Sequence, residues 1–160
     1  MTSAGDVETT DDPDDPPVGL TRDAGWNAGA RRTIRERADV VWHVLLSDLL
    51  PLWFGTVDER LELLRGAPYR TREGRTGEIR SAEPGRRMRF TRSIDGGDGS
   101  TTVQLTVLAA ATGATVAFHE ERLAGPDERA ASIREWKAAL ERIATAFDGP
   151  PPVPSDEEDR

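Results

Sequence analysis

Residues 101–147 read TTVQLTVLAAATGATVAFHEERLAGPDERAASIREWKAALERIATAF, and this stretch determines the fold class. Apolar and polar side chains alternate on both sides of Thr112-Gly113, a pattern typical of two antiparallel strands joined by a turn. From Pro126 onward the apolar residues recur at helical spacing, and proline suits the first position of a helix. The stretch therefore predicts two strands and then a long helix over 126–147, with an apolar stripe of Ile133, Trp136, Leu140, Ile143 and Phe147.

The residues upstream of this stretch predict more strands and two short helices. Short runs separated by Gly- and Pro-containing turns predict a β region from about Val57 to Glu121. Apolar residues at helical spacing over 38–49 predict a first helix that Pro51 ends, and 50–54 predicts a second helical piece. A first strand is expected at about 27–35, ahead of both helices.

An antiparallel sheet with one apolar face must bury that face against another element. The helix at 126–147 is the only predicted element long and apolar enough to do so. We therefore predict an α+β fold in which a curved antiparallel sheet of about six to seven strands surrounds a long C-terminal helix. Two short helices follow the first strand and close one end.

Both ends of the 160-residue chain differ from this domain in composition. Residues 1–19 form an acidic segment and residues 148–160 a Pro-rich acidic one, and both lack the apolar residues that would offset the entropy of ordering. We predict that both are disordered tails around a domain at 20–147. The two tails carry about −10 of charge and the whole chain −8, so the domain itself is slightly basic.

Composition excludes several classes of protein and site. The chain has no cysteine, no apolar run of membrane-spanning length and no secretory signal, so we expect a cytoplasmic protein without disulfides. Its two histidines, His43 and His119, fall on exposed faces, and we expect neither a metal nor a cofactor. Residues 65–92 are arginine-rich but poor in aromatic residues, which favours a solvated sheet face over a nucleic-acid interface. The DGGDG segment at 95–99 lacks the spaced ligands of a calcium loop and predicts a turn.

Three stretches of the chain carry a family resemblance. They are GWNAGARRTIRERADVVWHVLLSDLLPLWFG at 25–55, TGEIRSAEPGRRMRFT at 76–91 and the stretch at 101–147, with Trp42, Trp53 and Trp136 at positions that fit. Together they resemble the START-like, helix-grip superfamily, also called SRPBCC, and within it proteins similar to the C-terminal domain of the heat-shock protein 90 ATPase activator. The resemblance covers about residues 20–147 and implies a helix-grip fold. Members of this superfamily bind lipids, hormones or polyketides, assist a chaperone, or are cyclases, so the fold does not determine the function.

The cleft of this superfamily implies an apolar ligand pocket between the sheet and the C-terminal helix. Alternation in the strands and spacing in the helices give its expected lining: Trp42, Leu46, Trp53, Phe54, Ile79, Met88, Phe90, Leu105, Phe118, Trp136 and Leu140. We expect an enclosed volume bounded by Phe90, Phe118 and Trp136. An interior fully packed by these side chains is the alternative, and it would favour an interaction domain over a binding protein.

Two charged residues share the inward face with these apolar side chains. Glu120 follows Val116 and Phe118 in the alternation, and Arg92 follows Met88 and Phe90. Their strands should run parallel, with the strand at 101–110 between them, so the two side chains should meet across about 10 Å. An ion pair there would orient the polar head of a ligand or would be purely structural; Arg32 is a rival partner for Glu120.

Three functions follow from the residues and the resemblance. The first is binding of an apolar or amphipathic small molecule, with the apolar lining above plus Arg92 and Glu120 as ligand-binding residues. The second is an interaction domain with a chaperone as partner, and the third is an enzyme of the polyketide-cyclase type. No catalytic residues are assigned, because Glu120 and its arginine are the only inward acid–base groups found.

Overall fold

The computed structural model describes residues 20–21, 25–94 and 99–148. The tails predicted at 1–19 and 148–160 lie outside these residues except for Asp148, and so does most of the turn predicted at 95–99. No helix in the described part of the chain is long and apolar enough to cross a membrane.

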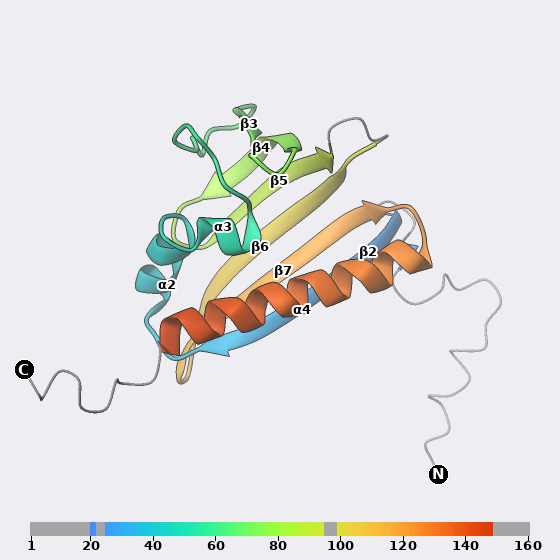
Figure 1. Ribbon diagram of the computed structural model, residues 1–160. Helices are drawn as coiled ribbons and strands as arrows, with labels where there is room; N and C mark the ends of the chain where they lie inside the picture. Colours follow the sequence, from blue (N-terminus) through green and yellow to red (C-terminus); the bar gives the residue numbers. More distant parts are fainter. Residues whose placement is uncertain (1–19, 22–24, 95–98, 149–160) are drawn as a thin grey trace, which may run out of the picture.

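One antiparallel sheet of seven strands forms the body of the domain, in the order β1-β2-β7-β6-β5-β4-β3 (Figure 1). The strands are β1 Leu20–Thr21, β2 Gly25–Ile34, β3 Pro68–Arg70, β4 Arg75–Glu83, β5 Arg87–Ile94, β6 Thr101–Ala110 and β7 Gly113–Leu123. Strands β3 to β7 follow one another as a meander, whereas β2 comes from the start of the chain and pairs with β7. The predicted fold class is confirmed.

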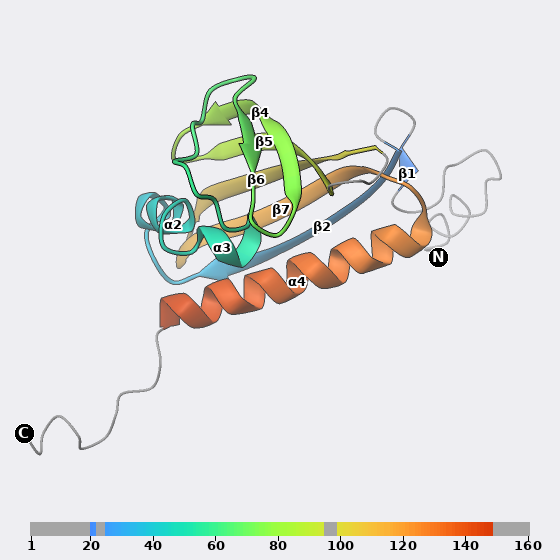
Figure 2. The same cartoon turned by 45° about the horizontal axis from the view of Figure 1, so that its top comes forward.

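In the described part of the chain, three helices cover one face and one end of this sheet. They are α2 Ala38–Leu45, α3 Leu50–Trp53 and α4 Pro126–Asp148. Helix α4 begins with Pro126 and carries Asp127 and Glu128 in its first turn, where the helix dipole favours acids. It runs along β2 and β7, while α2 and α3 close the end of the sheet near the C-terminus of α4 (Figures 1 and 2).

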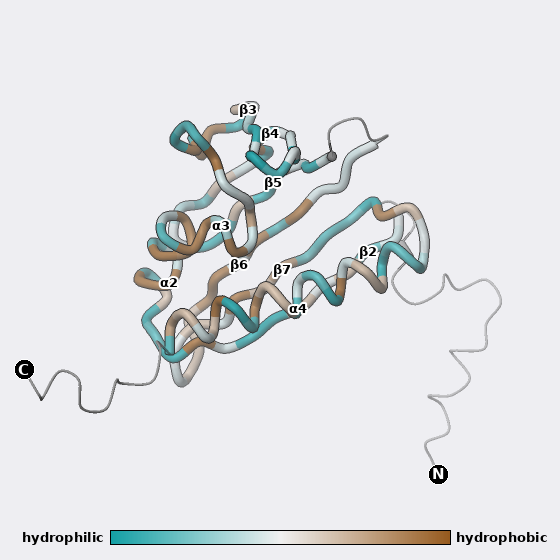
Figure 3. Tube along the Cα trace, in the orientation of Figure 1, coloured by the Kyte–Doolittle hydropathy of each residue, from teal (hydrophilic) through white to brown (hydrophobic). Residues whose placement is uncertain are grey.

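Alternation along the strands gives the sheet one buried face. Val103, Leu105 and Val107 of β6 are at most 2% exposed, and Val116 and Phe118 of β7 are equally buried. Within α4 the predicted stripe is buried at Trp136, Leu140 and Ile143. The apolar residues of α2, α3 and the lower part of β6 gather at the same end of the molecule (Figure 3). The core therefore lies between the inner sheet face and the three helices.

Several boundaries differ from the predictions. The first helix is predicted over 38–49 with Pro51 ending it, but α2 ends at Leu45 and Pro51 lies in the first turn of α3. The segment 57–67 is not a strand, so the β region begins at Pro68 rather than Val57. Helix α3 ends at Trp53, with Phe54 as its C-cap, whereas the prediction extends it to residue 54. The strand predicted at 27–35 is β2, which covers Gly25–Ile34. Segment 57–67 alternates weakly and carries several charges, and the structure uses it as a loop over the sheet edge.

Candidate functional site

The predicted apolar lining residues all lie in the interior between the sheet and the helices. All but Leu46 belong to the buried core, and Leu46 packs against that core while partly exposed. The three tryptophans at positions 42, 53 and 136 come from α2, α3 and α4, so each of these three helices contributes a large ring to this interior. The structure thus brings together what the pattern predicted to be close.

Six rings form a continuous group, here called the aromatic cluster: Trp53, Phe54, Tyr69, Phe90, Phe118 and Trp136. Phe118 stacks on Trp136 with centroids 4.5 Å apart and planes at 16°. Trp53 contacts Phe118 at 5.5 Å and Phe54 at 5.5 Å, and Phe54 contacts Tyr69 at 4.6 Å. Such contacts contribute beyond the area that the rings bury.

The enclosed volume expected between Phe90, Phe118 and Trp136 is filled in this structure. These side chains are 1%, 1% and 0% exposed, so almost no water-sized space touches them. The ring contacts account for the filling, because Trp53 of α3 lies against both Phe90 and Phe118. Among the described residues, this part of the interior is packed core.

Glu120 and Arg92 form the predicted ion pair, and it is buried. Arg92 Nε donates to Glu120 Oε2 at 3.2 Å, and Arg92 Nη2 donates to Glu120 Oε1 at 3.1 Å. The two side chains are 10% and 3% exposed. Their strands β5 and β7 flank β6, as predicted. The rival, Arg32, instead pairs with Glu141 at the surface, 2.6 Å away.

Three further side chains donate hydrogen bonds to the Glu120 carboxylate. Thr101 Oγ1 lies 2.5 Å from Oε2, and Ser132 Oγ and Trp136 Nε1 lie 2.8 Å and 2.9 Å from Oε1. With the two bonds from Arg92, every lone-pair direction of the carboxylate is used. Glu120 on β7 is thus hydrogen-bonded to side chains of β5, β6 and α4.

The exposed end of this network is a second carboxylate on α4. Glu135 accepts hydrogen bonds from Arg92 Nη2 at 2.8 Å and from Arg92 Nη1 at 3.1 Å, and Arg75 Nη2 reaches it at 3.2 Å. Glu135 and Arg75 are about one-third exposed. Because two arginines face two carboxylates, the group is electrically neutral. The guanidinium of Arg92 also lies 4.8 Å from the ring centre of Trp136.

The electrostatics of the pair favour its charged form. Burial by itself would raise the pKa of Glu120, but the charge of Arg92 and the hydrogen bonds from Thr101, Trp136 and Ser132 outweigh it, so the pKa is lowered. Burial likewise opposes the charge of Arg92, and Glu120 and Glu135 overcome it, so the pKa of Arg92 is raised. A carboxylate held ionised by five donors is poorly suited to take up a proton in a reaction.

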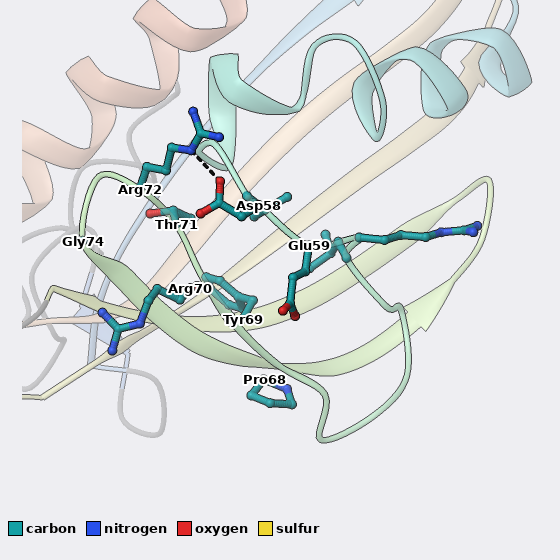
Figure 4. A pocket seen from close by; sticks show the side chains of 11 residues that line it. Asp58, Glu59, Pro68, Tyr69, Arg70, Thr71, Arg72 and Gly74 are labelled. Carbon is teal, nitrogen blue, oxygen red and sulfur yellow. Dashed lines mark hydrogen bonds and ion pairs between the residues drawn. The ribbon is translucent and has the colours of Figure 1, made fainter.

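A cavity of about 510 Å³ adjoins the aromatic cluster at the edge of the sheet. It lies between the loop at 57–61 and the segment 68–74, and its lining includes Val57, Leu61 and Tyr69. Tyr69 lies in this wall (Figure 4). It also belongs to the aromatic cluster, where it contacts Phe54 and Phe90. None of the residues predicted to bind a ligand lines this cavity.

Local backbone features build the cavity walls. Gly55 has a φ of +130°, which favours glycine, and a Cβ there would lie 2.7 Å from Thr71 Cγ2. This allows the chain after α3 to pass close to the segment after β3, where Glu73 Oε1 accepts a hydrogen bond from Thr56 N at 2.9 Å. That bond lowers the pKa of Glu73 to about 2. Arg72 and Asp58 join the same two segments with a 2.6 Å ion pair (Figure 4).

Tyr69 is held in place on the cavity side of the cluster. Its hydroxyl donates to the carbonyl of Thr91 at 2.6 Å, and its ring covers Gly77 on the neighbouring strand. A Cβ at Gly77 would lie 2.9 Å from Tyr69 Cε2 and 1.9 Å from Thr91 O, so only glycine fits beneath the ring. Burial raises the pKa of the Tyr69 hydroxyl, which keeps it a neutral donor.

Sequence reasoning missed Tyr69, Thr101, Ser132 and Glu135. Ser132 lies one helical turn before Trp136 on the buried face of α4, and a polar residue at that spacing could have been recognised as a partner for Glu120. The described residues hold no group of three or more His, Asp or Glu placed to bind a metal ion. His43 is exposed on α2, and His119 is part-exposed on the outer sheet face.

A long helix packed on one face of a curved antiparallel sheet is the helix-grip fold. Comparison with solved structures finds proteins with the same fold. The chain is similar to CalU16 from Micromonospora echinospora, with 19% identity, a TM-score of 0.67, and coverage of 83% of this chain and 82% of that one. It is also similar to protein CV1439 from Chromobacterium violaceum, with 16% identity, a TM-score of 0.61, and coverage of 78% and 98%.

A third similar structure is DynU16, a protein of the dynemicin biosynthetic locus. The identity is 20% and the TM-score 0.66 over 76% of this chain, which spans about half, 47%, of DynU16. No family model matches the sequence, and no curated protein matches it either. At these identities the likeness shows the fold.

Proposed function

We propose that this domain binds an apolar or amphipathic small molecule at the cavity beside Tyr69. The observation that carries the proposal is the continuity of the aromatic cluster with that cavity. Ring contacts run from Tyr69 in the cavity wall through Phe54 and Trp53 to Phe118 and Trp136 beside the ion pair. Because Tyr69 contacts Phe54, a ligand that packs on Tyr69 lies next to a residue that the sequence predicts to line the pocket.

The size and chemistry of the cavity fit such a ligand. Small-molecule sites commonly enclose about 300–1,000 Å³, and this cavity has about 510 Å³. Val57, Leu61 and Tyr69 offer apolar contact, while charged side chains of both signs at its rim can meet a polar head. DynU16 comes from a locus that makes a small molecule, which is in keeping with a small-molecule ligand here.

Within this proposal Arg92 and Glu120 position the ligand site and do not bind a head group themselves. Their carboxylate and guanidinium are already bonded to each other and to Thr101, Ser132, Trp136 and Glu135. A ligand would have to break these bonds to reach either charge. The pair holds α4 against the sheet and keeps Trp136 at the inner end of the cluster.

The two alternatives have less support. A chaperone-associated interaction domain would present an apolar docking face, and the large hydrophobic side chains exposed in the described residues are Leu64 and Leu108, on separate elements. A cyclase needs an inward acid or base, and the ionised Glu120 has no free lone pair. The filled interior removes the predicted deep pocket and by itself favours an interaction domain, so the binding proposal rests on the separate cavity at the edge of the cluster.

Fluorescence titration with 8-anilinonaphthalene-1-sulfonate, which joins aromatic rings to an anionic group, tests the proposal. For a probe of this size we expect a Kd on the order of 10 μM, from about −0.3 kcal/mol per non-hydrogen atom. The matched variants are Leu61→Trp, which fills the cavity, and Leu64→Trp, on the same loop but 66% exposed and outside the lining.

Leu61→Trp should weaken binding at least about tenfold, and Leu64→Trp should leave it unchanged, with both melting temperatures close to that of the parent. Bound probe should also raise the melting temperature of the parent protein by mass action. Equal binding by both variants, or no binding by the parent, would contradict the proposal.

A further inference from the structure

The outer face of the sheet carries a second cavity, of about 420 Å³, on the side away from the helices. Strands β4 to β7 and the loop before β3 contribute to it. Met88 and Phe90 point into the core. Side chains alternate along β5, so Arg89 and Thr91 point to the opposite face and line this cavity. The sheet thus separates it from the aromatic cluster, and it belongs to no part of the proposed ligand site.

Four guanidinium groups from four separate elements line this cavity: Arg65, Arg80, Arg89 and Arg122. Glu121 is the single carboxylate among the lining residues. Arg80 pairs with Glu78 at 2.6 Å, and Arg89 reaches Glu121 at a long 3.5 Å. Arg65 and Arg122 have no side-chain partner among the described residues. Among the described residues, the cavity lining therefore carries more positive than negative charge even after its ion pairs are counted.

Two β-bulges lie beside this cavity, and the one in β7 directs an arginine to this face. Between Ile79 and Ser81 the strand β4 has one residue more than its partner β5, and that extra residue is Arg80. Between Glu120 and Leu123 the strand β7 has one residue more than β2, and there Arg122 has a φ of +69°. In an unbulged β7, Arg122 would share the inward face of Phe118 and Glu120.

The conformation of Arg122 is unusual in itself. It is the single non-glycine residue with positive φ in the described part of the chain. Left-handed backbone is strained for a non-glycine residue, because its Cβ lies too close to the following carbonyl oxygen. Bulges are common at sheet edges and beside active sites, where they can re-aim a side chain, and strained backbone clusters at ligand-binding sites. Arg122 meets that description, because its side chain lines the cavity and has no partner there.

We propose that this outer cavity binds a small phosphorylated molecule carrying two or more negative charges. Planar guanidinium groups bind phosphate through paired hydrogen bonds, and several converging arginines favour a multiply charged anion over a single carboxylate. Hydroxyl groups surround the arginines and can donate to the remaining phosphate oxygens: those of Ser81, Thr91, Ser100 and Thr102. The scarcity of aromatic side chains in this lining argues against stacked nucleic-acid bases.

Isothermal titration of the full chain with pyrophosphate, at about 0.15 M salt so that distant charges are screened, tests this site. The first variant is Arg122→Gly, which removes the guanidinium and gives the positive φ to the residue that tolerates it, so the fold is retained. The second is Arg65→Gln, on the loop. The matched control is Arg31→Gln, because Arg31 is exposed on β2 of the same sheet and lies outside the cavity.

We expect saturable binding of pyrophosphate and weaker binding of inorganic phosphate. Each cavity variant should lower pyrophosphate affinity about tenfold, the effect of one charge-assisted hydrogen bond, and Arg31→Gln should change it less than twofold. Leu61→Trp should bind pyrophosphate like the parent, which separates this site from the one beside Tyr69. Absence of binding, or an equal loss in Arg31→Gln, would overturn the proposal. So would preferential binding of single-stranded RNA that depends on the same arginines, because the face would then be a nucleic-acid interface.

Discussion

Arginine side chains have opposite surroundings on the two faces of the sheet. On the inner face Arg92 is buried, faces two carboxylates and lies over a tryptophan ring. On the outer face Arg65 and Arg122 line a cavity and have no partner among the described side chains. Burial explains the difference, because an unpaired buried charge would be very costly while a solvated one is not. Paired charge here stabilises the fold, and unpaired converging charge remains available for a ligand.

Trp136→Ala would break the inner face most severely. It removes a side chain that is 0% exposed, stacks on Phe118 and donates to Glu120, so we expect unfolding free energy to fall by about 3–5 kcal/mol. Urea denaturation measures this loss. Lys137→Ala, at the exposed neighbouring position, is the control and should change stability by less than about 0.5 kcal/mol. A loss below about 1 kcal/mol for Trp136→Ala would place the ring outside the core.

Arg92→Met tests whether the inner pair needs both charges. The variant leaves the Glu120 carboxylate buried with only neutral donors, so we expect a loss of about 3 kcal/mol. The double variant Arg92→Met with Glu120→Leu should recover part of that loss, since no buried charge then remains unpaired. Chemical denaturation of the single and double variants gives the coupling. A double variant less stable than the single one would contradict this account of the pair.

The inner face should also be sensitive to acid. Because the pKa of Glu120 is depressed in the folded protein, its contribution is complete above the ordinary value of 4.5 and is lost as the pH falls through the folded value. Urea midpoints of the parent should therefore decline more steeply below pH 4.5 than those of Glu120→Gln. Parallel curves for the two proteins would show that Glu120 is not the group responsible.

Removal of the acidic tails should have the smallest effect on stability and a measurable one on the outer face. Deleting residues 1–17 and 150–160 changes the net charge from −8 to about +1. We expect the melting temperature to change by less than about 5 °C. A change of that size would correspond to a loss of about 1 kcal/mol or more in unfolding free energy for a domain of this size. Pyrophosphate affinity should rise a few-fold at low salt and converge with the parent at high salt. A larger fall in melting temperature would show that a tail packs on the domain.

The inner face could be predicted from sequence far better than the outer one. Residue parity places Glu120 and Arg92 on the same face, and the meander order places their strands two apart, so their contact follows from two simple rules. The same parity rule fails at Arg122 and at Ser81, because in each strand a bulge adds one residue and resets the alternation. Neither bulge has a glycine at the extra position, so the sequence carries no signal from which the bulge could be predicted.

The predicted pocket shows a different limit. Periodicity identifies Phe90, Phe118 and Trp136 as inward-facing, and all three are. Whether inward-facing rings enclose space or fill it depends on how α3 docks, and Trp53 fills it. The cavity beside Tyr69 depends instead on a loop between α3 and β3 that has no periodicity, held by contacts such as the one from Glu73 to Thr56. Long-range loop contacts of this kind leave no local pattern in the sequence.

The pairing of β2 with β7 has a consequence for how the chain folds during synthesis. Strands β3 to β6 can pair with their sequence neighbours as they emerge from the ribosome. Strand β2 must wait for β7, because its residues pair with residues 80 to 97 positions later, from Ile34↔Ala114 to Trp26↔Leu123. Helix α4, which covers both, is made later still. Contacts between such distant segments slow folding. Strand β2 therefore stays without its β7 partner until translation of the domain is nearly complete.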